Sequence, residues 1–356
     1  MTFAQMGQTG ETSTHVRSQL LDVLDGWQRD FPLAPHPYAE IARSTGVSES
    51  SLLLGLSELQ TDCILGRVGA TIRPNTIGAS MLAAMKVPED RLDEVARIVN
   101  AAPDVNHNYE REHDFNLWFV IAAPDALRLH RGLERIRSAT GLDILELPLE
   151  RSYYIDLGFP LGDRSGAEAQ WKAAGSSVHG GEQRARSTTL DDDDLKLLSA
   201  LERGLMLVPR PYFALGTEIG LRETEVIERI SRLVASSVIT RFGFIVRHRR
   251  LGYRANAMVV FDVQDDRVDA LGEMFAREDF VTLCYRRPRH GSRWPYNLFC
   301  MIHGLERSRV AEQAGLLARS GGVELRSHAV LFSRRCFLQR GTRIARSSEI
   351  QREAAQ

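Results

Sequence analysis

Apolar residues recur at helical spacing in the first part of the chain. Over 48–60 they fall on one face of a helix, and Ser48 is a suitable N-cap for it. These apolar residues are Leu52, Leu53, Leu56 and Leu59. Helices are also expected over 16–28 and 38–44, and the β-prone segment 64–72 follows the last of the three. Two helices joined by a short turn that contains glycine, with a wing after them, indicate a winged helix-turn-helix.

The next part of the chain alternates strand patterns with helix patterns. The expected order is βαββαβ, that of a ferredoxin-like domain, in which one sheet carries two helices on one face. In the first half of the chain the ranges are 81–87, 89–100, 104–111, 115–122, 127–138 and 143–153. The same order returns over 257–263, 267–277, 281–287, 297–303, 306–318 and 323–337.

The chain repeats itself. The motif Pro-x-Pro-Tyr that ends at Tyr38 returns at Tyr212, and the same register, without a gap, places Gly69 on Gly243. After a small change of register, VNHNYERE in the first half aligns with VTLCYRRP in the second half. The chain is therefore two copies of one module of about 150 residues, which is a common domain size.

This duplication determines the predicted fold class. We expect an α+β protein, a tandem duplication of a winged helix-turn-helix plus a ferredoxin-like domain. Because each sheet has an uncovered apolar face, the two copies are expected to pack on each other as an intramolecular pseudo-dimer. The predicted divisions are a disordered tail (1–14), the first helix-turn-helix (15–78), the first ferredoxin-like domain (79–157), a flexible linker (158–190), the second helix-turn-helix (191–252), the second ferredoxin-like domain (253–340) and a tail (341–356).

Composition and charge exclude several classes of protein. The chain has 356 residues, of which 43% are hydrophobic, and it has no apolar run long enough to span a membrane. The formal net charge of -1 provides no overall basic field for holding phosphates. The polar N-terminus lacks the pattern of a secretory signal, so we expect a cytoplasmic protein.

The four cysteines stand far apart in the sequence. None belongs to a C-x-x-C pair or has a histidine beside it at metal-ligand spacing, so neither a zinc site nor a disulfide framework is expected. They are Cys63, Cys284, Cys300 and Cys336.

A winged helix-turn-helix before a ferredoxin-like domain resembles the Lrp/AsnC transcription regulators, so DNA binding is one hypothesis. Direct readout of bases relies on arginine, lysine, asparagine and glutamine. In the first copy, the recognition helix carries Glu49 and Glu58 and no lysine or arginine. In the second copy, arginines are interspersed with glutamates: Arg222, Glu223, Glu225, Glu228, Arg229 and Arg232. We interpret the motif as an inherited scaffold and keep a DNA-binding regulator as the alternative.

Polar and aromatic residues gather at two places in each copy. One is the junction after the wing, which contains Arg73 in the first copy and Arg247 and His248 in the second. The other is the central hairpin of the ferredoxin-like part, over 107–116 and 285–297. Arginines beside tyrosine and tryptophan suit a flat polyanionic ligand, because rings offer a face and guanidinium groups bind carboxylates. Single-stranded nucleic acid, or a solvated basic loop without a ligand, fits the same pattern.

The hairpin motifs carry a closer resemblance. The first copy has N-H-N-Y-E-R-E followed by F-N-L-W-F, and the second has C-Y-R-R-P followed by W-P-Y-N-L-F and the segment RHRRLGYRANAM over 247–258. This pattern resembles the siroheme decarboxylases over both copies, in a form that fuses two subunits. The resemblance implies removal of the C12 and C18 acetate carboxyls from siroheme, giving 12,18-didecarboxysiroheme for heme d1 or an alternative heme pathway.

The resemblance also implies the partners. Siroheme brings its own iron, so no separate cofactor or protein-held metal is expected. A homodimer and further siroheme decarboxylase subunits are left open as protein partners, and neither a membrane nor DNA is expected. A regulator that senses heme without converting it is a further alternative.

Two histidines distinguish the copies. His107 aligns with Leu283, and His248 aligns with Pro74, so each copy keeps an imidazole where the other has none. Family members usually have histidine at the position of Leu283, which argues against an equivalent second site. We therefore expect one pocket between the copies, where His107 and His248 act as acid catalysts or as an axial contact to the substrate iron.

The remaining predicted site residues bind or line the macrocycle. A structural role remains the alternative for each histidine. The predicted substrate-binding residues are Tyr109, Arg111, His113, Arg247, Tyr285, Arg286, Arg287, His290, Arg293 and Trp294.

Overall fold

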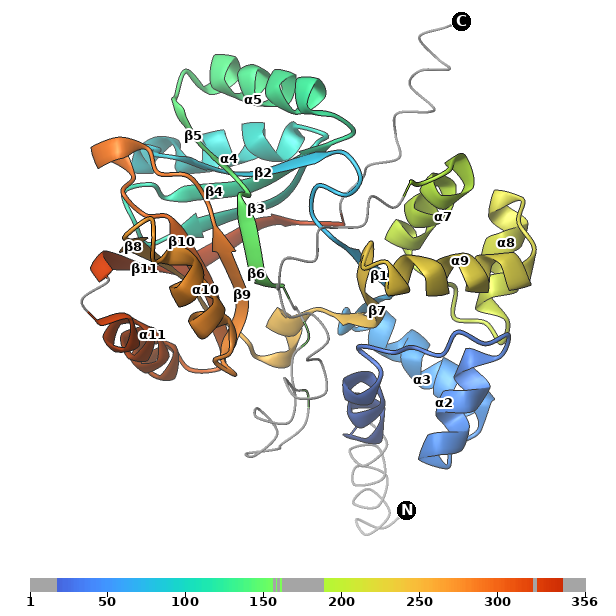
Figure 1. The fold of residues 1–356 in the computed structure, drawn as a ribbon. Helices are drawn as coiled ribbons and strands as arrows, with labels where there is room; N and C mark the ends of the chain where they lie inside the picture. Colours follow the sequence, from blue (N-terminus) through green and yellow to red (C-terminus); the bar gives the residue numbers. More distant parts are fainter. Residues whose placement is uncertain (1–17, 156–157, 159–160, 162–188, 323–324, 342–356) are drawn as a thin grey trace, which may run out of the picture. The chain divides into compact units, whose positions relative to one another are not determined.

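The computed structural model describes residues 18–155, 158, 161, 189–322 and 325–341. The chain divides into two compact units, each of which takes matching parts from both copies (Figure 1). The helix-turn-helix unit holds the described residues up to Arg73 and from 189 to Gly252. The ferredoxin-like unit holds those from Pro74 to 155 and from Tyr253 to 341. The predicted tails and most of the predicted linker lie outside the described residues.

The helix-turn-helix unit begins with a helix over 18–26. The first copy continues with α2 (Pro37–Thr45), α3 (Glu49–Thr61) and strand β1 (Leu65–Ile72). The second copy contributes α7 (Asp192–Arg203), α8 (Pro211–Ile219), α9 (Glu223–Ala235), β7 (Ile239–Val246) and the short 3-10 helix η2 (His248–Leu251). The Oγ of Ser48 accepts a hydrogen bond from the backbone N–H of Ser51 at 3.1 Å, so the predicted N-cap is confirmed.

The Pro-x-Pro-Tyr motifs hold the two copies of this unit together. The hydroxyl of Tyr38 donates to the carbonyl oxygen of Met206 at 3.3 Å, and that of Tyr212 donates to the carbonyl oxygen of Pro32 at 2.7 Å. Met206 and Pro32 are equivalent residues of the repeat. Each tyrosine is fully buried and crosses to the other copy, so the repeated motif forms a reciprocal contact between the copies.

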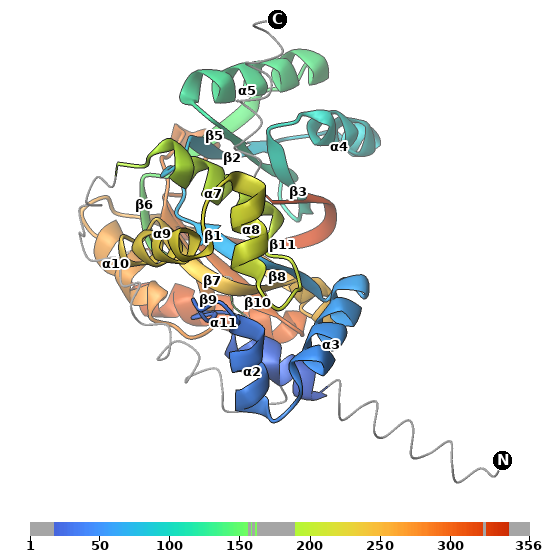
Figure 2. The same cartoon turned by 90° about the vertical axis from the view of Figure 1, so that its right-hand side faces the viewer.

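The ferredoxin-like unit contains two modules, one from each copy (Figures 1 and 2). The first consists of β2 (Ala79–Met85), η1 (Glu89–Arg91), α4 (Leu92–Ala101), β3 (Val105–Arg111), β4 (Leu117–Ala123), α5 (Ala126–Thr140), β5 (Ile144–Pro148) and β6 (Arg151–Ile155). The second consists of β8 (Ala255–Val263), α10 (Val268–Ala276), β9 (Val281–Arg286), η3 (Gly291–Arg293), β10 (Leu298–Gly304), α11 (Arg307–Gly321) and β11 (Leu325–Gln339). The α+β tandem duplication is confirmed.

The final strand of each module crosses to the other module. Among the described residues the strands form a nine-stranded sheet in the order β5-β2-β4-β3-β11-β8-β10-β9-β6. The prediction of one strand over 143–153 is wrong: β5 pairs with β2, whereas β6 pairs with β9 of the second copy. Pro148, which has no N–H to donate, ends β5. The long strand β11 makes the equivalent crossing without a break, pairing first with β8 and then with β3.

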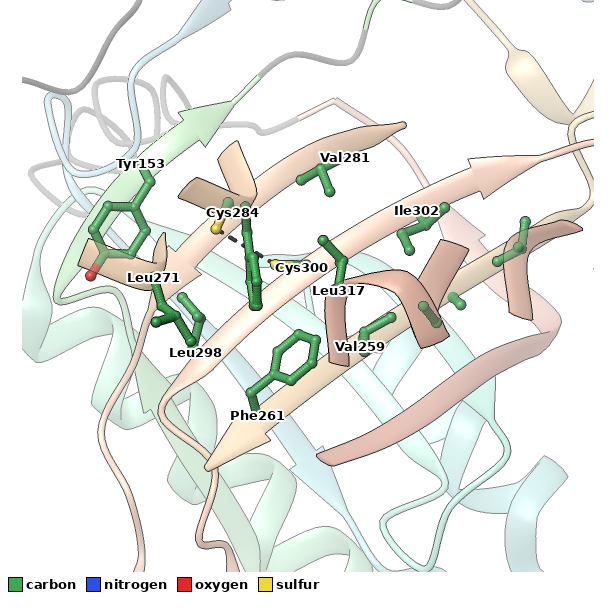
Figure 3. Packing of buried hydrophobic residues seen from close by; sticks show 14 of the residues in the cluster. Tyr153, Val259, Phe261, Leu271, Val281, Cys284, Leu298, Cys300, Ile302 and Leu317 are labelled. Atoms are coloured by element: carbon green, nitrogen blue, oxygen red, sulfur yellow. Dashed lines mark hydrogen bonds between the residues drawn. The ribbon is translucent and has the colours of Figure 1, made fainter. Parts of the chain in front are cut away.

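Three apolar clusters stabilise this unit. One lies between the first module's sheet and helices α4 and α5, and another lies between the second module's sheet and helices α10 and α11 (Figure 3). The third joins the facing sheets of the two copies, so the predicted pseudo-dimer is confirmed. Its buried members are Ala84, Phe115, Trp118, Leu145, Leu147, Met258, Val260, Trp294, Phe299 and Leu331.

None of the helices within the described part of the chain has the length and apolar character needed to cross a membrane.

Candidate active site

Strand β3 turns three of the predicted site residues toward the other copy. Tyr109 lies opposite Trp118, which belongs to the cluster between the copies. His107 and Arg111 are two residues away on either side, so strand alternation places them on the same face. Asn108 points to the opposite face, where its Nδ2 donates to the carbonyl oxygen of Ala96 at 3.3 Å. His107, Tyr109 and Arg111 therefore share the face between the copies.

The second copy presents an equivalent tyrosine and arginine. Tyr285 lies opposite Phe299, which also belongs to the cluster between the copies. The guanidinium of Arg287 lies 5.3 Å from the centre of the Tyr285 ring, and that of Arg111 lies 5.8 Å from the centre of the Tyr109 ring. The two Tyr–Arg pairs, Tyr109 with Arg111 and Tyr285 with Arg287, are repeated features of one face.

Each arginine of the Tyr–Arg pairs donates to the backbone of the opposite copy. An Nη1 donor of Arg111 contacts the carbonyl oxygen of Leu331 in β11 at 3.2 Å. Nη1 of Arg287 contacts the carbonyl oxygen of Leu147 in β5. These bonds orient both guanidinium groups along the facing sheets, and Arg111 also approaches Sδ of Met301 at 3.9 Å.

Arg287 is a cation without a counter-charge in the part of the chain that the structure describes. Among the described residues no carboxylate forms an ion pair with it, and its buried Nε has no hydrogen-bond partner. Burial lowers the pKa of the Arg287 guanidinium to about 10, so the group still carries its charge at neutral pH. Buried charges in proteins are normally paired, because desolvation is costly. Arg287 therefore provides a place for an anionic ligand group.

His107 is neutral at neutral pH in this structure. Burial lowers the pKa of its imidazole to about 4. Its Nδ1 lies 3.2 Å from Oδ1 of Asn106, an acceptor that selects the tautomer with the proton on Nδ1. The ring also stacks with Tyr109 at a centroid distance of 6.3 Å. This arrangement leaves the Nε2 lone pair to accept a proton or to contact a metal ion.

The hairpin residues His113 and Trp294 lie in an aromatic cluster. Nδ1 of His113 accepts a hydrogen bond from the backbone N–H of Phe115 at 3.0 Å, which fixes its ring orientation. Trp294 is fully buried, with its ring centroid 5.4 Å from His113 and 5.3 Å from Trp118. Trp294 is thus a core residue of the contact between the copies, which supports the hairpin from inside.

Two other predicted arginines, Arg286 and Arg293, already bind carboxylates. Nε of Arg286 lies 3.0 Å from Oε2 of Glu150, and Nη1 of Arg293 lies 2.6 Å from Oδ2 of Asp143. His290 also has a protein partner, the carbonyl oxygen of Glu146, at 2.7 Å. Arg111 and Arg287 thus each lie on the face between the copies, against the backbone of the opposite copy, while Arg286 and Arg293 form ion pairs.

Arg247 and His248 belong to the helix-turn-helix unit. The backbone N–H of Arg247 donates to the carbonyl oxygen of Ile64 at 2.8 Å, and its side chain is exposed. His248 begins η2, whereas His107 lies in the ferredoxin-like unit. The hypothesis that the two histidines share a pocket stays a prediction.

Sequence reasoning missed Asn106 and the proximity of two cysteines. Asn106 stands beside His107 in the quoted N-H-N motif, but strand alternation gives no reason to expect contact between neighbouring side chains.

Cys284 and Cys300 lie opposite each other on β9 and β10, with 3.6 Å between their Sγ atoms (Figure 3). Both are buried free thiols. Within the described residues no group of three or more His, Cys, Asp or Glu side chains could hold a metal ion.

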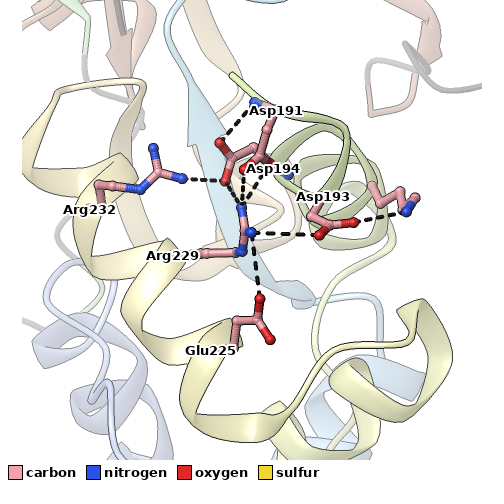
Figure 4. Close-up of polar contacts among 7 residues, drawn as sticks. Asp191, Asp193, Asp194, Glu225, Arg229 and Arg232 are labelled. Atoms are coloured by element: carbon pink, nitrogen blue, oxygen red, sulfur yellow. Dashed lines mark hydrogen bonds and ion pairs between the residues drawn. The ribbon is translucent and has the colours of Figure 1, made fainter. Parts of the chain in front are cut away.

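The arginines of the second recognition helix also have carboxylate partners. Nη1 of Arg229 on α9 contacts Oδ1 of Asp191 and Oδ1 of Asp194, each at 2.8 Å (Figure 4). Arg232 also binds Asp194. The hydrogen bonds that Arg229 makes with Asp191 and Asp194 raise the pKa of the Arg229 guanidinium. Asp191 caps α7, as expected for negative charge at a helix start. The cationic groups of α9 thus face an acidic cluster of their own unit, which leaves less charge for a DNA backbone.

Known proteins are similar to this chain over its length. It is 47% identical over 333 residues to a siroheme decarboxylase NirDL subunit of Paracoccus pantotrophus, covering 91% of this chain and 97% of the relative. A siroheme decarboxylase NirD subunit of Stutzerimonas stutzeri is 44% identical over 151 residues, covering 42% of this chain and 99% of that relative. The crystal structure of the siroheme decarboxylase NirDL in complex with an iron-uroporphyrin III analogue has a TM-score of 0.66 and 28% identity, covering 95% of this chain and 96% of that chain.

The domains define the class of protein. Residues 77–153 and 250–338 match the AsnC-like ligand binding domain, so this is a fused, duplicated protein of the AsnC-like type. Residues 21–65 and 194–239 match the siroheme decarboxylase NirDL-like helix-turn-helix domain. The chain belongs to the siroheme decarboxylase NirDL family.

Proposed function

We propose that this chain decarboxylates siroheme. The observation that carries the proposal is the half-buried guanidinium of Arg287, whose buried Nε has no hydrogen-bond partner and which has no carboxylate partner among the described residues. A substrate with several carboxylates supplies the missing negative charge. The resemblance of the whole chain to siroheme decarboxylases supports the same substrate.

The Tyr–Arg pairs suit the shape of the substrate as well as its charge. Tyr109 and Tyr285 offer ring faces for a flat macrocycle, and Arg111 and Arg287 offer guanidinium groups for its carboxylates. Carboxylates that do not react are held by arginine. The carboxylate that leaves is destabilised where no such partner reaches it, because its charge is poorly solvated there.

His107 suits the proton transfer. Decarboxylation breaks the bond between the acetate methylene and the carboxyl carbon, and CO₂ leaves. The electron pair stays on the methylene carbon and is delocalised by the macrocycle. A proton from the imidazolium of His107 then completes a methyl group. Because the pKa of the ligand-free imidazole is about 4, a neighbouring substrate carboxylate is needed to raise it and to protonate the ring.

The finer assignments rest on the resemblance. We propose the C12 and C18 acetates as the reacting groups and 12,18-didecarboxysiroheme as the product, for use in heme d1 or an alternative heme pathway. The chain then needs no cofactor of its own, because the iron arrives with the substrate. We also propose that it acts in the cytoplasm, where a second copy or further decarboxylase subunits are candidate partners.

One anaerobic incubation of the full chain with siroheme tests the function. Mass analysis is expected to show two successive losses of CO₂, and Arg287→Met is expected to lower the rate at least about 10-fold, the value of one charged hydrogen bond. Arg203→Met, at an exposed ion pair with Glu218 in the helix-turn-helix unit, is the matched control.

The same experiment separates the alternatives. Siroheme that binds and remains unchanged would favour a heme-sensing regulator. Tight, sequence-selective binding of genomic fragments in a gel shift would instead favour a DNA-binding regulator.

A further inference from the structure

The crossing strands form two equivalent junctions in the ferredoxin-like unit. At the first junction β11 pairs with β3, and at the second β6 pairs with β9. Gln339 lies opposite His107 at the first junction, and Ile155 lies opposite Leu283 at the second. Because His107 and Leu283 are equivalent in the repeat, the two registers match, and residues at corresponding positions can be compared.

One ion pair has opposite polarity at the two junctions. At the first junction, Oε1 of Glu110 on β3 lies 3.6 Å from Nη1 of Arg334 on β11. At the second, Nε of Arg286 on β9 lies 3.0 Å from Oε2 of Glu150, the residue before β6. The matched registers make Glu110 equivalent to Arg286, and Arg334 equivalent to Glu150. The strand that pairs with the crossing strand thus carries an acidic residue at this position in the first copy (Glu110 on β3) and a basic residue in the second (Arg286 on β9).

The neighbouring ion pair does not change polarity. Nη1 of Arg335 lies 2.7 Å from Oδ1 of Asp93 at the first junction, and Nη1 of Arg151 lies 2.7 Å from Oδ2 of Asp269 at the second. Arg335 also binds Glu110, whose side chain is only 9% exposed. A charge at the position of Glu110 is therefore poorly screened. Arg151, the equivalent of Arg335, lies opposite Arg286 and binds Glu273 instead.

We infer that this reversed pair makes the strand exchange heterotypic, so that each copy accepts the crossing strand of the unlike copy. If two first copies paired, Glu150 would meet Glu110, and Arg151 would take the place of Arg335. If two second copies paired, Arg334 and Arg335 would both meet Arg286. Each like-charge contact would occur twice in such a dimer, which disfavours it against the native pairing. The partner that each junction fits is the complementary copy, whether in the same chain or in a second one.

The test reverses the charges of the ion pair at the first junction. In the double variant Glu110→Arg/Arg334→Glu both junctions have the same polarity, and each copy becomes complementary to itself. Glu112, which also contacts Arg334, keeps Arg307 as its partner. A protease site inserted within 162–188 of the full chain allows the folded protein to be cut between the copies.

The cut protein is unfolded, refolded and examined by native mass spectrometry. The unmodified chain is expected to return to complexes of one first and one second fragment. The double variant is expected to form dimers of like fragments, raising their share at least about tenfold. The control variant Lys86→Asp/Asp114→Lys reverses an exposed ion pair within the first copy and is expected to form no additional like-fragment dimers.

Two results would overturn the inference: equal shares of like-fragment dimers in the unmodified and double-variant proteins, or a double variant that stays wholly heterotypic. Denaturation of the uncut chain gives an independent measurement if the cut protein fails to refold. There Glu110→Arg and Arg334→Glu should each lower the unfolding free energy, and the double variant should recover part of the loss. Simple additivity of the two losses would contradict the proposed pairing.

Discussion

Gly69 of β1 lies directly opposite Gly243 of β7, and the two are equivalent residues of the repeat. A Cβ at Gly69 would meet the carbonyl oxygen of Leu201 at 2.9 Å, and one at Gly243 would meet that of Trp27 at 2.4 Å. Trp27 and Leu201 are equivalent as well. A local two-fold axis therefore passes between the two glycines, and the helix-turn-helix unit is a symmetric structure to which both copies contribute.

The close contact at Gly243 predicts a large effect of a single methyl group. Gly243→Ala should lower the unfolding free energy of the helix-turn-helix unit by about 2 kcal/mol or more, because backbone atoms cannot yield as a flexible side chain can. Gly26→Ala, where a Cβ would have no atom within 4 Å, is the control and should change stability little. Urea unfolding followed by circular dichroism measures both, and equal stabilities would disprove the steric argument.

The reciprocal tyrosine contacts are predicted to differ in strength. Tyr212→Phe removes a buried hydrogen bond of 2.7 Å and leaves the carbonyl of Pro32 without it, so a loss of about 1–2 kcal/mol is expected. Tyr38→Phe removes the longer bond of 3.3 Å and should cost less. Thermal unfolding of the two variants provides the comparison. The reverse order of stabilities would show that hydrogen-bond length does not determine their contributions.

Arg287→Met is predicted to separate stability from activity. The substitution removes a cation that has no carboxylate partner within the described residues, so the ligand-free protein should be as stable as the unmodified chain, or more stable by about 1 kcal/mol. Siroheme binding should nevertheless weaken, because a carboxylate contact is lost. Unfolding and siroheme titration are measured on the same samples. A large loss of stability would instead identify Arg287 as a structural residue.

His107 should make stability depend on pH. Its folded-state pKa of about 4 lies below the usual 6.5, so the folded imidazole stays neutral where the unfolded one binds a proton. The contribution of His107 to the unfolding free energy is zero above about pH 6.5. As the pH falls toward 4 it becomes unfavourable and reaches about 3 kcal/mol. His107→Gln should remove this part of the pH dependence in urea unfolding between pH 4 and 7. If the unfolding free energy of His107→Gln changes with pH as steeply as that of the unmodified chain, the lowered pKa does not belong to His107.

Siroheme is expected to raise the pKa of His107 in the complex, because a carboxylate beside the imidazole favours the charged form. The imidazole resonances of the protein, followed through a pH titration with and without siroheme, provide the measurement. A pKa that stays near 4 with siroheme bound would exclude His107 as the proton donor.

Local patterns predicted most of the elements. Ser48 caps α3 and apolar spacing located the helices, because capping and periodicity depend on residues a few positions apart. The same reasoning failed at 143–153. A strand has the same alternating pattern whether it pairs with its own copy or with the other, so only the assembled sheet shows that β6 crosses to β9.

For the candidate site, too, the sequence predicted one part and the tertiary structure decided the other. The hairpin motifs and their repetition named His107, Arg111, Arg287 and their tyrosines, but named Arg286 and Arg293 with them. Only the tertiary structure decided which arginines are already neutralised. Arg286 and Arg293 meet Glu150 and Asp143, carboxylates more than a hundred positions away in the chain, whereas Arg287 meets none among the described residues. Composition and order determine which charges the chain carries, but their pairing depends on distances that exist only after the two copies have folded together.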